Sequence, residues 1–288
     1  MNNMFFLLLS ILSGITIVVC FKLAERLGLN TFTVIILNYL TAFLLSLSLT
    51  KNVLFSISLP ASGEIIAALI IGILFVILFR ILGASIKKAG MGISTIAAKI
   101  SVVIPVTFSI LAYHENMNVQ KTIGIILALI ALFLTLYRKE KTEKHFFLFP
   151  ILLFVGMGIV DSTVKFVQIN YLEKQSILVF STFVFLISFL TGLLMIVIEK
   201  VKITKGFSIP LFGVGIMLGI ANLGSLYFFI KALNSGFLNS SLIFTVNNLG
   251  ILILAVLTGI LFFRERLNWL NCVGFLLSLV SLYIIFES

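Results

Sequence analysis

The segment SILVFSTFVFLISFLTGLLMIVI, residues 176–198, indicates the class of fold, because it is a long apolar run without a charged side chain. A membrane-spanning α-helix needs about 20 such residues to cross a hydrocarbon core about 30 Å thick. A spanning β-strand would instead show alternating polarity over about ten residues. The segment therefore predicts a transmembrane helix.

Nine further apolar runs of comparable length occur along the chain. The ten predicted spans cover residues 4–24, 31–50, 61–82, 91–112, 119–137, 147–169, 176–198, 208–231, 237–262 and 268–286. Polar stretches such as Lys51-Asn52 and Lys87-Lys88 predict the connections between them. Of the 288 residues, 61% are hydrophobic and 10% are charged, whereas a soluble domain carries about 25% charged residues. We predict an all-α polytopic membrane protein with ten transmembrane helices.

Several function classes are disfavoured by the residue inventory. The formal net charge of +10 could indicate nucleic-acid binding, but basic residues beside apolar spans ordinarily set orientation and contact anionic lipids. Cys20 and Cys272 lie in apolar runs without a CxxC or Cys/His cluster, so we expect no disulfide framework, metal or cofactor. No Walker loop, HExxH motif or nucleophile–base group is present, so we expect neither direct use of ATP nor an enzyme.

An internal repeat relates the two halves of the chain. Residues 89–94 (AGMGIS) resemble residues 235–240 (SGFLNS), and both segments open the fourth span of their half. The hairpin at residues 113–118 resembles the one at residues 263–268, and each has an Asn three residues after a Glu. We expect Asn118 and Asn268 to cap the N-termini of the fifth and tenth spans.

The repeat divides the chain into a first five-helix repeat at residues 1–137, a charged linker at 138–146 and a second five-helix repeat at 147–288. Because five is an odd number, the second half enters the membrane in the opposite sense, which makes the repeats inverted. Such architectures place the substrate site near the bilayer midplane between the halves, and rocking of one half gives alternating access.

The chain resembles the drug/metabolite transporter superfamily, in its ten-helix EamA-type branch. The matching features are Gly14 with Lys22 in the first span, Pro105 in the fourth, and the hairpins Glu115-x-x-Asn118 and Glu265-Arg266-Leu267-Asn268. The resemblance implies a central cavity lined mainly by helices one to four and six to nine. It also implies transport of amino acids or other small metabolites.

The sequence departs from the family's pattern at three places. A glycine usually precedes the hairpin glutamate, where this chain has His114 and Arg264. An arginine often lies in the second helix, where this chain has Asn38-Tyr39.

Two charged residues lie deep inside predicted spans, Lys99 in the fourth and Asp161 in the sixth. A charge near the bilayer centre costs about 2.5 to 3.5 kcal/mol, so each needs a partner or a wet cavity. Lys99 is a candidate ligand for a substrate carboxylate or phosphate; the alternative is a structural ion pair with Asp161 or a glutamate. Asp161 is a candidate for substrate binding and proton coupling; the alternative is an ion pair with Lys165, four residues further on.

Uncharged polar residues complete the set of candidates. Further substrate-binding candidates are Asn38, Tyr39, Asn222, Tyr227, Asn247 and Asn248. A shift of the repeat by about half a turn places Asn247 and Asn248 opposite Lys99. For each residue the alternative is interhelical hydrogen bonding, which contributes roughly 0.6 to 2 kcal/mol in membranes. Pro105 is a candidate hinge, because proline breaks or kinks a helix.

We therefore predict a secondary transporter that exports amino-acid-like or other small polar metabolites through a central cavity. The alternative is a lipid or glycolipid flippase or an accessory membrane subunit. A pump for cationic drugs is disfavoured because Lys99 would repel its substrate. The expected partners are a small-molecule substrate and membrane lipids, without nucleic acid, and the chain acts as a monomer or homodimer in a bacterial inner (plasma) membrane.

The orientation of the chain is left open by two conflicting indications. The odd-numbered loops hold twelve Lys and Arg residues and the even-numbered loops hold four. The positive-inside rule thus favours cytoplasmic odd loops and external termini, whereas the family resemblance implies cytoplasmic termini.

Overall fold

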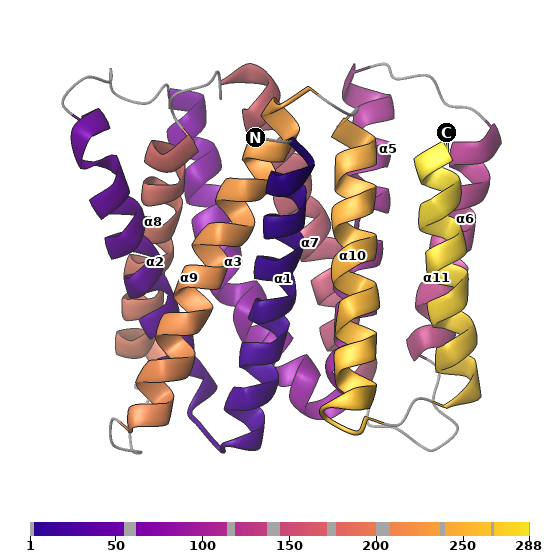
Figure 1. The fold of residues 1–288 in the computed structure, drawn as a ribbon, viewed down its shortest axis with the longest axis horizontal. Coiled ribbons are helices and arrows are strands. Elements are labelled where there is room, and N and C mark those ends of the chain that lie inside the picture. The colour runs from indigo at the N-terminus through magenta and orange to yellow at the C-terminus, as the bar shows by residue number, and fades with distance from the viewer. Residues whose placement is uncertain are drawn as a thin grey trace. The chain divides into compact units, whose positions relative to one another are not determined.

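The chain folds into α-helices throughout the part that the computed structural model describes (Figure 1). The described residues are 3–54, 62–113, 119–136, 145–171, 177–199, 208–236, 240–265 and 268–287. The helices are α1 (Asn3–Arg26), α2 (Thr31–Leu54), α3 (Ser62–Ala89), α4 (Met91–Ile100), α5 (Val103–Tyr113), α6 (Val119–Leu136), α7 (His145–Asn170), α8 (Ile177–Glu199), α9 (Ile209–Asn234), α10 (Ser240–Leu261) and α11 (Trp269–Glu287).

Eight of these helical segments are long and apolar enough to cross a membrane, with α4 and α5 together forming one of them at Met91–Phe108. The apolar parts of α6 and α11, Thr122–Leu134 and Trp269–Ile284, are shorter. Large apolar side chains are exposed along the spans, for example Ile66 in α3 and Leu194 in α8. Such surface suits hydrocarbon better than water. The chain is therefore an all-α integral membrane protein, which confirms the prediction at this level.

Two polar stretches that predict connections lie inside helices instead. Residues 51–54 are the last turn of α2, and Lys87 and Lys88 belong to the last turn of α3. Lys87 and Lys88 are exposed, so their charged ends reach water while the backbone stays helical. The end of α3 comes at Gly90, whose φ of 93° breaks the helix. A charged pair can end an apolar run without ending a helix.

The chain divides into two compact units, and each takes helices from both halves of the sequence. The first unit comprises Met1–Gly83 and Thr163–Ser235, and the second comprises Ala84–Ser162 and Gly236–Ser288. Helices α3 and α7 therefore contribute one end to each unit.

In the first unit, α9 packs against α1 and α2, and α2 also packs against α8. The approach of α9 to α2 is close because a Cβ added at Gly219 would lie 2.6 Å from the Asn38 carbonyl oxygen. Helices α3 and α8 are joined by the Ser188 hydroxyl, which donates to the Gly72 carbonyl at 3.0 Å. Small residues and hydroxyls of this kind are the usual means of packing helices in lipid.

In the second unit, α6 packs against α11, and α10 packs against both α4 and α11. The Ser281 hydroxyl of α11 donates to the Gly124 carbonyl of α6 at 2.7 Å. The start of α11 confirms the predicted cap at Asn268, since the Asn271 amide donates to the Asn268 side chain at 2.7 Å. The predicted cap at Asn118 lies outside the described residues. The Asn268 amide in turn donates to the Asn271 side chain at 3.2 Å, a reciprocal arrangement like a capping box.

Candidate functional site

The fourth predicted span is interrupted a few residues before Pro105. Helix α4 ends at Ile100 and α5 begins at Val103. Proline has no N–H to donate to the carbonyl four residues before it, which is that of Ser101. The Ser101 carbonyl instead accepts from the Ile104 amide at 2.9 Å. The fourth span therefore consists of two shorter helices, and use of the break as a hinge stays a prediction.

Lys99 lies in the last turn of α4, just before this interruption. Every other residue of α4 is buried, and Lys99 alone is partly exposed. Its side chain is therefore the one group of this short helix that has access to space outside the packed core. A ligand approaching α4 would meet an ammonium group first.

Asp161 of α7 lies within electrostatic range of Lys99, and both belong to the second unit. Neither charged group makes a hydrogen bond or an ion pair with another residue in the described part of the chain, and both are partly exposed. The ion pairs considered as alternatives, Lys99 with Asp161 and Asp161 with Lys165, are thus not formed among the described residues. The two opposite charges therefore interact electrostatically without forming an ion pair.

Asn248 of α10 lies within about one helical turn of the depth of Lys99, and Asn247 precedes it in the same helix. Helices α4 and α10 pack together, and the start of α4 is level with Gly259, because Glu265 approaches both Gly90 and Gly259. Lys99 is about 12 Å along α4 from its first residue, and Asn248 is about 16 Å back along α10 from Gly259. Both asparagines are buried, and the Asn248 side-chain nitrogen has no hydrogen-bond partner among the described residues.

The remaining candidates lie in the first unit. Asn222 of α9 donates its side-chain amide to the side-chain oxygen of Asn38 in α2 at 3.2 Å. The Asn38 nitrogen and the Tyr39 hydroxyl are buried without a partner among the described residues. The Tyr39 ring packs against Phe79 and Phe185. The Asn38–Asn222 contact is the interhelical bond considered as the alternative to substrate binding.

Tyr227, five residues after Asn222 in α9, is engaged in packing. The Lys231 ammonium lies 4.9 Å from the centre of the Tyr227 ring and 5.0 Å from the centre of the Phe6 ring of α1. Such cation–π contacts hold a lysine at the edge of an apolar region. The structure thus separates the candidates: Asn38, Tyr39, Asn222 and Tyr227 lie in the first unit, and Lys99, Pro105, Asp161, Asn247 and Asn248 lie in the second.

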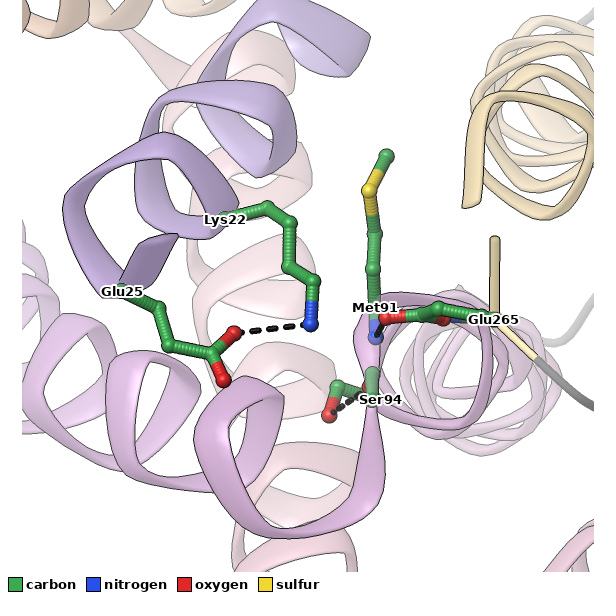
Figure 2. A network of polar contacts seen from close by, with 7 residues as sticks. Lys22, Glu25, Met91, Ser94 and Glu265 are labelled. Carbon is green, nitrogen blue, oxygen red and sulfur yellow. Dashed lines mark hydrogen bonds and ion pairs between the residues drawn. The ribbon is translucent and has the colours of Figure 1, made fainter. Parts of the chain in front are cut away.

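Two glutamates have partners that the sequence did not indicate (Figure 2). Glu25 of α1 lies 2.8 Å from the ammonium of Lys22, a residue noted only for its spacing from Gly14. Glu265, noted as a hairpin marker, accepts a hydrogen bond from the Met91 backbone amide at 2.7 Å. The internal repeat marks Glu265 as a residue of a hairpin. It does not predict that Glu265 contacts Met91, because the two residues lie far apart in the sequence. Among the described residues, no group of three His, Cys, Asp or Glu side chains could hold a metal ion.

The proteins that this chain resembles match it over nearly its whole length, and their descriptions state no activity. No family model matches the chain. A protein of Haemophilus influenzae described as uncharacterized is 28% identical over 294 residues, which cover 99% of this chain and 98% of the relative. A protein of known crystal structure has a similar fold, with a TM-score of 0.60 and 13% identity over 96% of this chain and 97% of that chain. At this identity the likeness shows the fold alone.

Proposed function

We propose that the chain is a secondary transporter for small polar metabolites, with a binding site between Lys99 and Asp161. The observation that carries the proposal is the pair of opposite charges that lie within electrostatic range but form no ion pair. Charges inside a membrane protein are costly unless they are partnered or reach water. A separated pair that is partly exposed is best explained by a ligand or water between them.

The charges define the chemistry of the proposed substrate. An ammonium group binds a carboxylate or phosphate, and a carboxylate binds an ammonium or hydroxyl donor. An amino-acid-like solute carries both complementary groups. The unpartnered nitrogen of Asn248 is a further donor at a similar depth. When the solute is absent, a proton can neutralise the Asp161 carboxylate and leave Lys99 as the main charge. The proton and the solute would then bind to the same carboxylate in turn, which is the basis for the proposed coupling role of Asp161.

The proposal includes ten spans in two inverted repeats, as in the EamA-type branch that the sequence resembles. Helices α6 and α11 have 18 and 19 residues, within the range of about 17 to 25 residues that a span requires. The fifth and tenth predicted spans are α6 and α11, which pack together in the second unit, and α2 packs with its counterpart α8 in the first. The first helices of the halves differ, since α1 lies in the first unit and residues 145–162 of α7 lie in the second. The two pairings support a two-fold relation between the halves. Export across a bacterial plasma membrane, as a monomer or homodimer, completes the proposal.

The test is transport by the full chain in proteoliposomes that contain a panel of labelled amino acids, organic acids and sugar phosphates. Lys99→Ala and Asp161→Asn are compared with the wild type. Lys87→Ala is the matched control, because Lys87 is an exposed lysine at the end of α3. Each of the two variants loses a charge-assisted contact of about 1.5–3 kcal/mol. The half-saturation concentration of the solute should therefore rise roughly 10- to 100-fold.

Two results would contradict the proposal. An unchanged transport profile in Lys99→Ala would remove Lys99 from the site. Movement of a labelled lipid between leaflets, without movement of any soluble metabolite, would favour the flippase alternative.

A further inference from the structure

The N-terminus of α4 is capped by a side chain from a distant part of the chain. Gly90 precedes α4 and has no side chain to offer as a cap. Both oxygens of Glu265 take this role: one accepts from the Met91 amide at 2.7 Å and the other from the Gly92 amide at 3.1 Å. Amides at the start of a helix have no partner within the helix, and in a membrane an unpaired amide costs several kcal/mol.

The structure around Glu265 holds its carboxylate in one place. Arg264 has a φ of 54°, and the Glu265 amide donates to the Gly259 carbonyl at 2.9 Å, as at a helix C-terminus with a left-handed residue. A Cβ added at Gly90 or at Gly259 would lie 3.1 Å from the same oxygen of Glu265. Two glycines and two amides thus lie close around the carboxylate. Figure 2 shows Glu265 beside the Met91 amide.

We propose that Glu265 is a positioning residue for the transport site, because it ties α4, and with it Lys99, to the turn after α10. The proposal rests on the function proposed above. Lys99 lies eight residues after Met91, about 12 Å along one short helix. The helix is interrupted directly after Lys99, so α5 does not extend it. The tie at its N-terminus therefore sets the depth and rotation of Lys99 relative to α10 within the second unit.

Graded variants separate the contributions of charge and length. Glu265→Gln keeps the side-chain length and one acceptor, so it retains one of the two hydrogen bonds at most. Glu265→Asp keeps the charge but withdraws the carboxylate by about 1.5 Å, the length of one C–C bond. Glu287→Gln is the matched control, because Glu287 is an exposed glutamate near the end of α11.

The first measurement is independent of transport. In a Cys20→Ala, Cys272→Ala background, Lys99→Cys is labelled in membranes with a water-soluble maleimide, with and without Glu265→Gln. We expect the labelling rate of position 99 to change at least five-fold, while Tyr227→Cys in α9 labels at its original rate. Equal changes at both positions, or no change at position 99, would overturn the proposal.

The second measurement uses a transported solute and a double-mutant cycle. We expect Glu265→Gln to raise KM at least five-fold when Lys99 is present, and to leave KM unchanged in the Lys99→Ala background. An equal factor in both backgrounds would mean that Glu265 supports the fold and does not position Lys99. If no solute is transported, the proposed function fails while the labelling result still decides the role of Glu265.

Discussion

Gly90→Ala tests the arrangement at the start of α4 most directly, because two separate features of the structure require glycine there. Gly90 has a φ of 93° and a ψ of 163°, a region of backbone space that only glycine occupies readily. The added methyl group would also lie 3.1 Å from a Glu265 oxygen and 3.3 Å from its carboxyl carbon. The substitution therefore strains the backbone and pushes the carboxylate away from the amides that it caps.

The expected destabilisation is the sum of these two effects. A side chain in such a backbone region costs about 1–3 kcal/mol. A hydrogen bond to a charged group contributes about 1.5–3 kcal/mol, and a displacement of a few tenths of an ångström loses part of it. The free energy of unfolding should fall by about 2–5 kcal/mol. At about 2–4 °C per kcal/mol, the value for chains of 150–250 residues, this lowers Tm by roughly 4–20 °C.

The assay is thermal unfolding of the purified protein in a mild detergent, followed by circular dichroism. Gly28→Ala is the control, because Gly28 also has a positive φ, 62°, but an added Cβ would meet nothing within 4 Å. Gly28→Ala should lower the free energy of unfolding only by the strain of a left-handed residue, about 1–2 kcal/mol. In a Glu265→Ala background the part of the Gly90→Ala cost that comes from displacing the carboxylate should disappear, and the backbone strain should remain. A cost no larger than that of Gly28→Ala would refute the reasoning.

Three further predictions concern other parts of the chain. Arg264→Gly should raise the stability by about 0.5–1 kcal/mol, because Arg264 has a φ of 54°; an unchanged Tm would contradict this. Gly219→Val should disrupt the packing of α9 on α2, whereas Gly213→Val should not, because an added Cβ at Gly213 meets nothing within 4 Å; equal yields of monodisperse protein would contradict it. Alkaline phosphatase fused to the C-terminus should be active outside the cell, as the loop charges predict, and an expressed but inactive fusion would reverse the orientation.

Much of the helical layout could be predicted from the sequence because lipid allows few alternatives. A run of about 20 apolar residues has to be helical in a membrane, and the predicted span at 31–50 and its helix α2 begin at the same residue. The break beside Pro105 and the cap at Asn268 could also be predicted, because both follow from local chemistry. The end of α3 could not, because hydropathy marks where a helix leaves the membrane and not where its backbone hydrogen bonds stop.

The pairing of polar residues could be predicted only in part. The cost of charge in lipid singled out Lys99 and Asp161, but the same cost applies to a structural ion pair and to a ligand site. Asn38 and Asn222 are 184 residues apart, and Glu265 and Met91 are 174 apart. A single sequence contains no information on contacts at such separations, because apolar helices of similar composition can pack in many orders.

Arg264, where the pattern that this sequence resembles usually has glycine, lies at a position whose backbone suits glycine. The residue before the hairpin glutamate has a left-handed backbone, in which glycine has no steric penalty. The 6→1 hydrogen bond from Glu265 to Gly259 requires that conformation. In this chain the left-handed residue and the glutamate after it direct a carboxylate at the start of α4. Arg264 carries the strain of that conformation, and the contact between Glu265 and α4 is the one that we propose to position Lys99.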